Sequence, residues 1–471
     1  MSVTGKDLLA LGLPPGKNFG AALAEVNRLA LSGAALETFV RAMMPPPVLP
    51  LQEAPGFALH LDAETPEEIA NREAVVRSMQ VLMRTPTVRA GAVMPDACPA
   101  GAEGTIPVGG VVVAEGAIHP GMHSADICCS LMLTEFDDAE PAAVMEAVHA
   151  ATHFGAGGRE AGRRFALPEA LRAGFAANAF LKDGRIAAMA ETHLGTQGDG
   201  NHFAFVGRSS VTGKTCLVTH HGSRGVGALL YEKGMKAAEK LRVQRSPRTL
   251  PVNAWLEAGS DEGRAYWEAL QLVRRWTKLN HEVLHGATLE TAGAGLVRRI
   301  WNEHNFVFRK GDLFYHAKGA TPVDPAFLPD SDGVQIVPMN MAEPVLLVKA
   351  GRAPGALGFA PHGAGRNWSR RQHLRRLGAH DEGEVFARET KGLDVRFYSG
   401  HADLAELPSA YKRAAEVRRQ MAAHDLAEVV EEILPYGAIM AGDWERDAPW
   451  RKRLAAREAA KLAPSGAGGV K

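Results

Sequence analysis

The sequence predicts an α+β protein in which a small helical module precedes a larger, mixed α/β core. Near the N-terminus, apolar residues recur at helical spacing over residues 21–30 and again over 34–43. A proline-rich stretch then interrupts the pattern, because proline lacks the backbone N–H that a helix needs. Beyond it, short β-rich runs mix with helical patterns, which is typical of a mixed fold. We therefore expect a helical module at 1–43, a semi-rigid linker at 44–55 and a core at 56–445.

Individual elements of the core are visible as separate patterns. Runs rich in valine, leucine and threonine at 108–114, 215–219 and 344–349 predict strands. Apolar residues at helical spacing predict a helix over 261–279. After the core, residues 446–471 form a charged tail, which we interpret as a solvated terminus.

Charge and cysteine content limit the class of protein. Lys and Arg total 53, and so do Asp and Glu, so the chain has no global bias toward nucleic acid or membrane, although a local basic cleft is compatible with RNA. Four cysteines are too few for a disulfide framework and favour a reducing compartment. The chain has no apolar stretch of about 18 residues and no signal-like N-terminal pattern, so we expect a cytoplasmic protein with no membrane partner.

One glycine-rich loop ends in a histidine: residues 195–203 read GTQGDGNHF. Three glycines let the backbone adopt positive φ and approach a ligand closely, so we interpret the loop as part of a binding site. Thiol, imidazole or carboxylate groups also lie beside glycine or polar residues at 125–130, 219–225, 301–305, 315–321 and 361–366. Such groups bind metals, and their dispersal along the chain predicts a site assembled by the fold rather than a zinc finger.

These stretches, in this order, resemble the RtcB family of tRNA-splicing, 3′-phosphate RNA ligases, in a divergent form. The matching motifs include Met94-Pro-Asp96, Asp126-Ile-Cys-Cys129, Gly200-Asn-His-Phe203, Gly222-Ser-Arg-Gly225, Lys318-Gly-Ala-Thr321 and His362-Gly-Ala-Gly-Arg366. The resemblance implies an RtcB-like core with a metal site at its centre. It implies a ligase that joins RNA 2′,3′-cyclic phosphate or 3′-phosphate ends to 5′-hydroxyl ends, in tRNA splicing or RNA repair. Two Mn²⁺ ions per chain and GTP would be its cofactors, and an activating helper protein would be among its partners.

The resemblance also assigns roles to particular residues. His362 would be the catalytic histidine that becomes nucleotidylated. The metal ligands would be Asp126, Cys129, His202, His220 and His304. Nucleotide binding would involve Asn201, His202, Phe203, Phe205, Pro338, Met339, Asn340, Met341, His362, Gly363, Ala364, Gly365, Arg366 and Tyr411. RNA would contact Arg224, Lys318 and Arg370.

Several positions depart from the family pattern. Cys128 and Ser130 flank Cys129, where the family has a small polar residue and a glycine, so Cys128 is a rival ligand. If this turn needs positive φ, a Cβ there costs about 1 kcal/mol. Phe205 stands where the family carries the glutamate that reads guanine, and residues 338–342 read PMNMA in place of PGSMG. The base preference is therefore open, because a phenyl ring cannot accept the N–H donors of guanine.

Two other functions are open beside the ligase. The chain could be a non-ligating relative that binds metal and RNA ends, or a metal-dependent cyclic phosphodiesterase. At the N-terminus, residues 4–16 resemble a helical motif in the RNA-binding part of tRNA nucleotidyltransferases, which implies RNA binding by the module at 1–43. The alternative for this stretch is a capped helix followed by a Pro-Gly turn.

Overall fold

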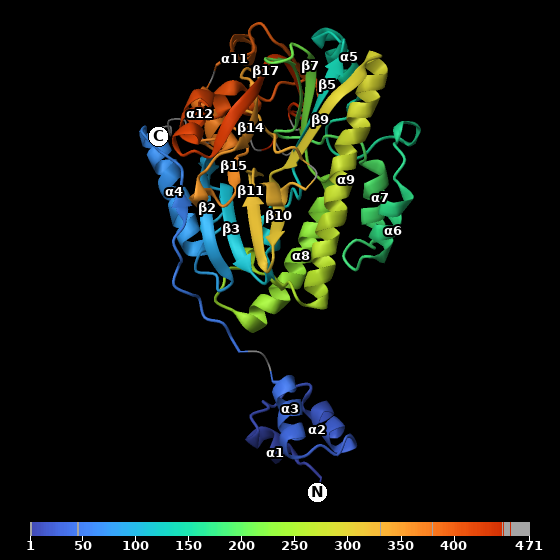
Figure 1. Cartoon of the computed structure of the whole chain (residues 1–471), viewed down its shortest axis with the longest axis vertical. Helices are drawn as coiled ribbons and strands as arrows, with labels where there is room; N and C mark the ends of the chain where they lie inside the picture. The colour runs from blue at the N-terminus through green and yellow to red at the C-terminus, as the bar shows by residue number, and fades with distance from the viewer. Residues whose placement is uncertain are drawn as a thin grey trace, which may run out of the picture. The chain divides into compact units, whose positions relative to one another are not determined.

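The computed structural model describes residues 2–44, 47–329, 331–378, 380–444, 446 and 453. They fall into two compact units, one containing the residues up to 50 together with 243–247, and the other containing the rest (Figure 1). The combination of helices and sheets confirms the predicted α+β class. Most of the predicted tail, and Pro45 and Pro46 of the predicted linker, lie outside the described residues.

The first unit contains the helices α1 (Gly5–Ala10), α2 (Phe19–Arg28) and α3 (Gly33–Met43). The carboxylate of Asp7 accepts hydrogen bonds from the backbone N–H and the hydroxyl of Thr4, which fixes the start of α1. Leu8, Val26 and Val40 are buried in a core that the three helices share. This shared core explains why apolar residues recur at helical spacing in this part of the sequence.

The second unit is built around an eight-stranded sheet. Its hydrogen-bonded order is β13-β14-β17-β6-β7-β5-β9, and β16 pairs with β17. Strands that adjoin in this order run antiparallel, whereas β16 and β17 run parallel. The strands are β5 (Ser130–Asp137), β6 (Phe203–Ser209), β7 (Thr215–His221), β9 (Gly295–Glu303), β13 (Gln335–Val337), β14 (Val345–Ala350), β16 (Asp394–Phe397) and β17 (Ala427–Met440).

Both faces of this sheet are buried, because successive side chains of a strand point to opposite faces. Phe205 and Val218 pack on one face. Val206 and Leu217 pack on the other, together with Val144 of α5 (Pro141–Ala151). Strands covered on both faces read as continuous apolar runs, and the runs predicted at 215–219 and 344–349 indeed coincide with β7 and β14.

A five-stranded sheet in the order β1-β2-β3-β11-β10 forms the other main layer. The predicted run at 108–114 lies in its strand β3. Two further ladders pair β12 with β15 and β4 with β8. The bounds are β1 (Ala58–Leu59), β2 (Val88–Cys98), β3 (Val108–Glu115), β4 (Ala117–Ile118), β8 (Leu256–Glu257), β10 (Asn305–Lys310), β11 (Leu313–Lys318), β12 (Ala320–Pro322) and β15 (Phe359–Pro361).

The helix predicted at 261–279 is the first part of a longer helix, α9 (Asp261–Ala292), which runs beside β5 and β9 (Figure 1). It ends at Gly293, whose φ of +63° suits glycine. The sequence pattern stops short because the buried face of the second half carries Asn280, His281 and His285, which hide the apolar period.

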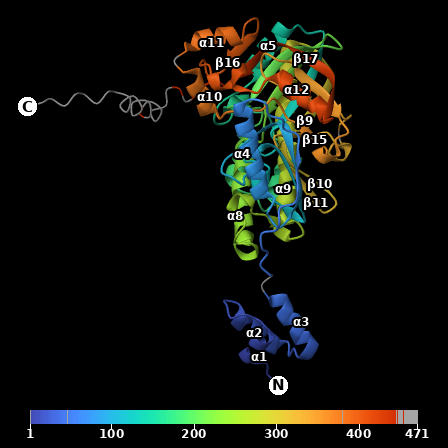
Figure 2. The same cartoon turned by 90° about the vertical axis from the view of Figure 1, so that its left-hand side faces the viewer.

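Among the remaining α-helices, α4, which faces the viewer in Figure 2, packs on β2, whereas α12 contacts β2 and β17 and α6 packs on α9. They are α4 (Pro66–Leu82), α6 (Glu169–Ala177), α7 (Gly184–Thr192), α8 (Arg224–Arg245), α10 (Arg370–Leu377), α11 (Glu382–Glu389) and α12 (Ala414–Ala423). Across the part of the chain that the structure describes, no helix combines the length and apolar character needed to span a membrane.

Candidate metal centre and adjoining pocket

Four neighbouring strands of the large sheet bring the predicted metal ligands to one edge. Cys129 directly precedes β5 and His202 directly precedes β6, whereas His220 lies at the end of β7 and His304 directly follows β9. The register pairs the start of β5 with the ends of β7 and β9, and the start of β6 with the end of β7. In an antiparallel sheet the start of one strand meets the end of its neighbour, so ligands far apart in sequence meet here.

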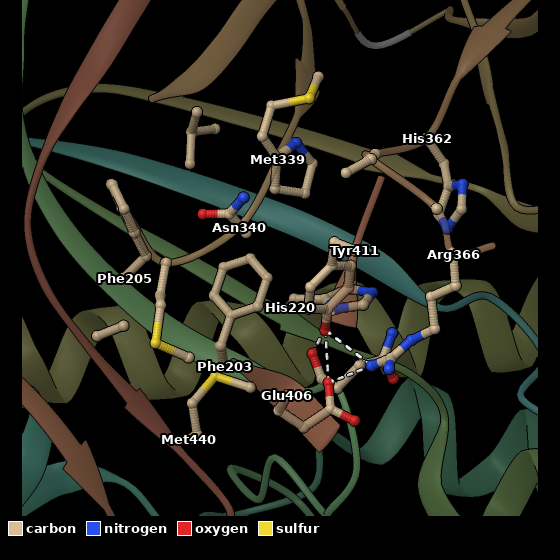
Figure 3. Close-up of a pocket in the computed structure, with 18 of the residues that line it drawn as sticks. Phe203, Phe205, His220, Met339, Asn340, His362, Arg366, Glu406, Tyr411 and Met440 are labelled. Atoms are coloured by element: carbon tan, nitrogen blue, oxygen red, sulfur yellow. Dashed lines mark hydrogen bonds and ion pairs between the residues drawn. The ribbon is translucent and has the colours of Figure 1, made fainter. Parts of the chain in front are cut away.

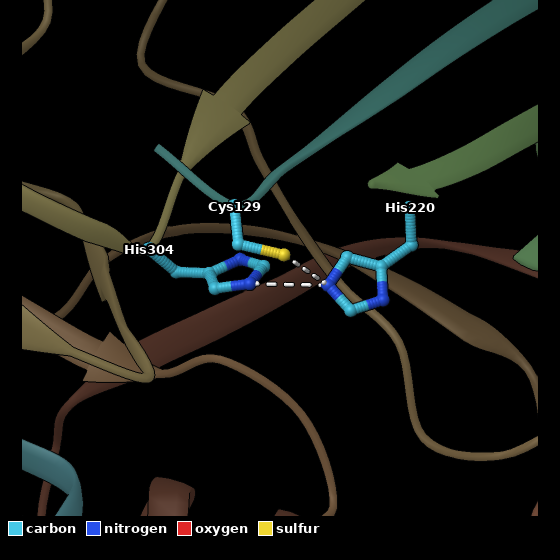
Figure 4. A group of neighbouring side chains, drawn as sticks. All are labelled: Cys129, His220 and His304. Atoms are coloured by element: carbon cyan, nitrogen blue, oxygen red, sulfur yellow. Dashed lines mark hydrogen bonds between the residues drawn. The ribbon is translucent and has the colours of Figure 1, made fainter. Parts of the chain in front are cut away.

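The ligand atoms form two groups that share one thiol, and Figure 4 shows the group made of Cys129, His220 and His304. The Cys129 Sγ lies 3.1 Å from Nε2 of His220, which is itself 3.1 Å from Nε2 of His304. The same Sγ lies 3.7 Å from Nε2 of His202, which is 3.4 Å from a carboxylate oxygen of Asp126. Within each group the ligand atoms lie within 4.8 Å of one another. A thiolate shared in this way could bridge two cations.

Backbone carbonyls orient two of the imidazole rings. The Nδ1 of His202 donates to the carbonyl of Gln197, and the Nδ1 of His220 donates to the carbonyl of Asn201. With Nδ1 protonated, the Nε2 lone pair of each ring points into the cluster. The glycine-rich loop at 195–203 therefore supplies one ligand, His202, and also the backbone carbonyls that orient the rings of His202 and His220.

Burial sets the protonation of the cluster. Burial lowers the pKa of His220 to about 3 and the pKa of His304 well below its usual value, so both rings are neutral and able to ligate. Burial, followed by the nearby charge of Asp126, raises the pKa of the Cys129 thiol well above its usual value. Burial also tends to raise the pKa of Asp126, but its interactions with His202, Cys129 and His220 together outweigh burial and lower that pKa. Asp126, His220 and His304 are thus in the protonation state that binds a cation, whereas the Cys129 thiol must lose a proton.

Metal affinity is therefore expected to rise with pH. A cation binds the thiolate, so binding expels one proton from Cys129, and below the pKa of the free thiol the apparent affinity should increase about tenfold per pH unit. Equilibrium dialysis with Mn²⁺ as the probe between pH 6 and 8 measures this slope. The Cys128→Ala variant should show the same slope, and an affinity that does not change over this range would contradict the role given to the thiol.

The two adjacent cysteines face different surroundings. Cys128 has a φ of +59° and its side chain lies in the main apolar core, near Thr277 of α9. Cys129 is the cysteine whose sulfur lies among the ligand atoms. The positive φ falls on Cys128, not on Ser130, which is already part of β5. The turn thus requires a positive φ at a residue that carries a Cβ, at a cost of about 1 kcal/mol.

A buried polar network lies behind the centre, between α9 and the strands. The Thr219 hydroxyl lies 2.7 Å from both Nδ1 of His281 and Nε2 of His285. The second ring nitrogens reach Ser130 at 3.0 Å and Thr134 at 2.7 Å, respectively. Both histidines are fully buried, and their hydrogen bonds join α9 to the strands. The network fixes β5 and β7, the strands beside Cys129 and His220.

A pocket of about 240 Å³ adjoins the metal centre, and His220 belongs to both (Figure 3). Of the residues predicted to bind nucleotide, His202 lies in the metal cluster. The others all line the pocket: Asn201, Phe203, Phe205, Pro338, Met339, Asn340, Met341, His362, Gly363, Ala364, Gly365, Arg366 and Tyr411. Residues from five separate stretches of the chain thus meet around one cavity. Its lining also includes Cys98, Val345, Glu406 and Met440, which the sequence did not indicate.

His362 follows β15 at one side of the pocket and is held by a buried carboxylate. Asp96 accepts hydrogen bonds from Nδ1 of His362 at 2.6 Å and from its backbone N–H at 3.0 Å. Lys412 donates to the carbonyls on either side of Asp96, those of Pro95 and Ala97, at 2.9 Å. The Nε2 of His362 is therefore the nitrogen available as a nucleophile. No role was predicted for Asp96, although its Met-Pro-Asp motif could have indicated one.

Gly365 is required for this arrangement. Its φ is +68°, and a Cβ at this position would lie 1.9 Å from the backbone oxygen of Asp96. Glycine thus lets the loop after His362 pass close to β2, the strand that carries Asp96.

A second buried carboxylate organises another part of the pocket wall. Glu406 is 1% exposed and accepts from Nη2 of Arg366 at 2.7 Å and from the hydroxyl of Tyr411. Arg370 lies 2.7 Å from its other oxygen. The Arg366 guanidinium also covers the Tyr411 ring at 4.4 Å. Two arginines share one carboxylate, so this wall carries a net positive charge that suits a phosphate group.

The remaining part of the pocket is apolar. Phe205, Met339, Met341 and Met440 are each at most 5% exposed. Asn340 contributes an amide, and its carbonyl oxygen already accepts from the backbone N–H of Ala342. A thioether and aromatic lining offers contact to a flat ring but, apart from Asn340, few polar partners for its edge.

The residues predicted to contact RNA lie in different settings. Arg370 lines the pocket. Lys318, at the end of β11, lies near Cys98, and burial lowers the pKa of this lysine. Arg224 donates to the Thr196 hydroxyl and to the carbonyl of Gly155, so it braces the glycine-rich loop.

Fold and site together define a class of protein: a mixed α+β protein with a thiolate, imidazole and carboxylate cluster beside a pocket that holds a carboxylate-oriented histidine. The family model described as tRNA-splicing ligase RtcB matches residues 78–441. The chain therefore belongs to the RtcB family.

Curated relatives are distant in sequence. A tRNA-splicing ligase RtcB of Pyrococcus horikoshii is 24% identical over 296 residues, which cover 52% of this chain and 32% of that protein. The tRNA-splicing ligase RtcB of Thermococcus kodakarensis is 26% identical over 285 residues, covering 52% of this chain and 58% of that protein. An RNA-splicing ligase RtcB of Mycobacterium tuberculosis is 25% identical over 291 residues, covering 52% of this chain and 64% of that protein. The chain thus matches between a third and two thirds of the length of these relatives, which is consistent with a divergent member.

Proposed function

We propose that the protein is an RNA ligase that joins 2′,3′-cyclic phosphate or 3′-phosphate ends to 5′-hydroxyl ends through a nucleotidylated His362, in tRNA splicing or RNA repair. The observation that supports this most directly is the orientation of His362. Asp96 holds its Nδ1, which leaves Nε2 available, and its ring centroid lies 5.0 Å from that of His304. A nucleophile beside a candidate metal centre and a pocket is what nucleotidyl transfer requires. RNA with such ends and an activating helper protein are its proposed partners.

The donor set fits two divalent cations, which we propose to be Mn²⁺. Neutral imidazoles, one carboxylate and a shared thiol are ligand types that divalent first-row metals accept. The residues that would hold them are Asp126, Cys129, His202, His220 and His304. When bound, the cations supply Lewis-acid stabilisation of the oxygens of the transferring phosphoryl group.

In the first step, Nε2 of His362 attacks the α-phosphorus of a nucleoside triphosphate. A P–N bond forms, and the P–O bond to pyrophosphate breaks. Nδ1 of His362 keeps its proton and donates it in a hydrogen bond to Asp96, and this carboxylate stabilises the positive charge that develops on the ring. Arg366 and Arg370 line the pocket and offer cationic donors to phosphate oxygens.

A labelling experiment tests the proposal. The protein is incubated with Mn²⁺ and each α-labelled triphosphate, and an acid-labile, base-stable phosphoramidate on His362 is sought by gel and peptide mapping. A labelled His362 peptide, together with sealing of RNA that carries a 2′,3′-cyclic phosphate and a 5′-hydroxyl, would support the ligase.

We expect the preference for GTP over ATP to be weak. A carboxylate that accepts two guanine N–H groups contributes about 1.5 to 3 kcal/mol, and Phe205 cannot provide it. Discrimination should therefore be relaxed by about ten- to a hundredfold, while stacking on aromatic rings tolerates either base. Labelling of His362 with GTP and ATP side by side measures this ratio, and labelling by GTP alone would mean that another residue reads the base.

The apolar end of the pocket favours a second candidate function. With Phe205 and the three methionines in place of a polar base site, a protein that takes no triphosphate is also consistent with the fold. It would be a metal-dependent phosphodiesterase that opens cyclic phosphates, or a protein that only binds metal and RNA ends. Opening of a 2′,3′-cyclic phosphate without any labelling of His362 would identify the phosphodiesterase, and binding without either reaction would identify the non-ligating relative.

A further inference from the structure

The stretch at 366–376 is the most basic segment beside the pocket. It contains five arginines and no acidic residue, although basic and acidic residues balance over the whole chain at 53 each. It starts in the pocket wall and continues through α10, which lies near α11 in the second unit (Figure 2). We call the part of this stretch formed by the half-buried Trp368 and the exposed Arg371, Arg375 and Arg376 the α10 surface.

The arginines of the stretch have different partners. Arg366 and Arg370 contact Glu406 and line the pocket. The guanidinium of Arg376 lies 4.0 Å from the centroid of the Trp368 ring. The Arg376 guanidinium also lies 3.9 Å from a carboxylate oxygen of Glu67 in α4.

Arg371 and Arg375 are exposed, and within the described part of the chain no carboxylate lies within ion-pair distance of either. They are four residues apart in a helix, so they project from the same side about 6 Å from each other. Two such cations next to a binding pocket give a local positive potential, and this potential attracts a polyanion.

We infer that the α10 surface binds the sugar-phosphate backbone of the RNA strand whose 3′-end is brought to His362. This inference rests on the proposed function. Arg370 lines the pocket and is the first residue of α10, so Arg371 and Arg375 lie within about two helical turns of the pocket wall. Trp368 is half-buried beside these arginines, and an aromatic ring is a stacking partner for the bases of a single-stranded nucleic acid. Phosphate contacts of this kind supply affinity rather than sequence preference.

The test compares the Arg371→Gln/Arg375→Gln double variant with the wild type in the full chain. The ligand is a fluorescent 12-nucleotide RNA with a 3′-phosphate, and its anisotropy gives the affinity at several salt concentrations. Loss of two phosphate contacts should weaken binding by about tenfold or more at 0.1 M salt. It should also reduce the slope of log affinity against log salt by about 1.4, since each contact to a single strand contributes about 0.7.

The matched control is Arg264→Gln/Arg275→Gln, which removes two exposed arginines of α9 and the same net charge. The control should bind RNA like the wild type. Equal affinity and slope in both double variants would overturn the inference, and so would a wild type that binds polyglutamate in preference to RNA. Labelling of wild-type His362 without RNA reports the ligase separately. If labelling fails but the arginine-dependent RNA binding holds, the ligase proposal falls and the RNA surface stands.

Discussion

Substitution of His362 by alanine is expected to abolish transfer of label from any α-labelled triphosphate, because no other group in the pocket combines a free imidazole nitrogen with a carboxylate on the opposite nitrogen. The Asp96→Asn variant tests the orientation separately. An asparagine amide can donate to Nδ1 and so favours the tautomer with the proton on Nε2, the nitrogen that must attack. We expect its labelling rate to fall about a thousandfold or more, as for the corresponding change in a carboxylate–histidine pair of serine proteases.

Thermal unfolding should be measured for both variants, since Asp96 is fully buried and its loss of charge also affects folding. His380→Ala is the matched control, because this histidine is exposed and does not line the pocket. Full labelling in the folded His362→Ala protein would show that a different residue is the nucleophile.

Substitution of Cys129 by alanine is expected to remove both metal ions. The thiol belongs to both ligand groups, whereas His304 belongs to one of them. Cys129→Ala should therefore lower Mn²⁺ affinity at both sites by about a hundredfold or more, and His304→Ala should release only one ion. Equilibrium dialysis followed by elemental analysis counts the ions.

The adjacent cysteine provides the control for this prediction. Cys128 lies in the apolar core, so Cys128→Ala should keep both ions and lose only stability. The assignment would be wrong if Cys128→Ala lost the metal while Cys129→Ala retained it. Such a result would place the sulfur ligand on the other side of the turn.

The metal centre and the pocket share residues and are not merely adjacent. His220 is a member of one ligand group and also lines the pocket, and Asn201 orients His220 while lining the same pocket. A ligand in the pocket thus touches groups that position a metal ligand. In a ligase this arrangement would couple nucleotide binding to the geometry of the centre.

The sequence by itself determined the mixed α+β class and the chemical types of the site residues. The runs at 215–219 and 344–349 are apolar because β7 and β14 are covered on both faces, so local composition reports burial directly. The glycine-rich loop and the His-Gly-Ala-Gly-Arg stretch are informative for a similar reason, because the local structure restricts which residue types fit. At Gly365 a side chain would collide with the backbone of Asp96, so the structure requires glycine there and the sequence shows it directly.

Only the tertiary structure decided how these residues act together. Adjacent cysteines have the same chemistry, and the turn before β5 decides that Cys129 faces the ligands and Cys128 the core. Asp96 and Glu406 acquire partners from stretches hundreds or tens of residues away, and no local pattern reports such contacts. The second half of α9 was missed because buried histidines, satisfied by hydrogen bonds to Thr219 and Thr134, replace the apolar residues that mark a helix. Periodicity and motifs record what each residue needs locally, whereas long-range pairing of strands decides which polar groups meet.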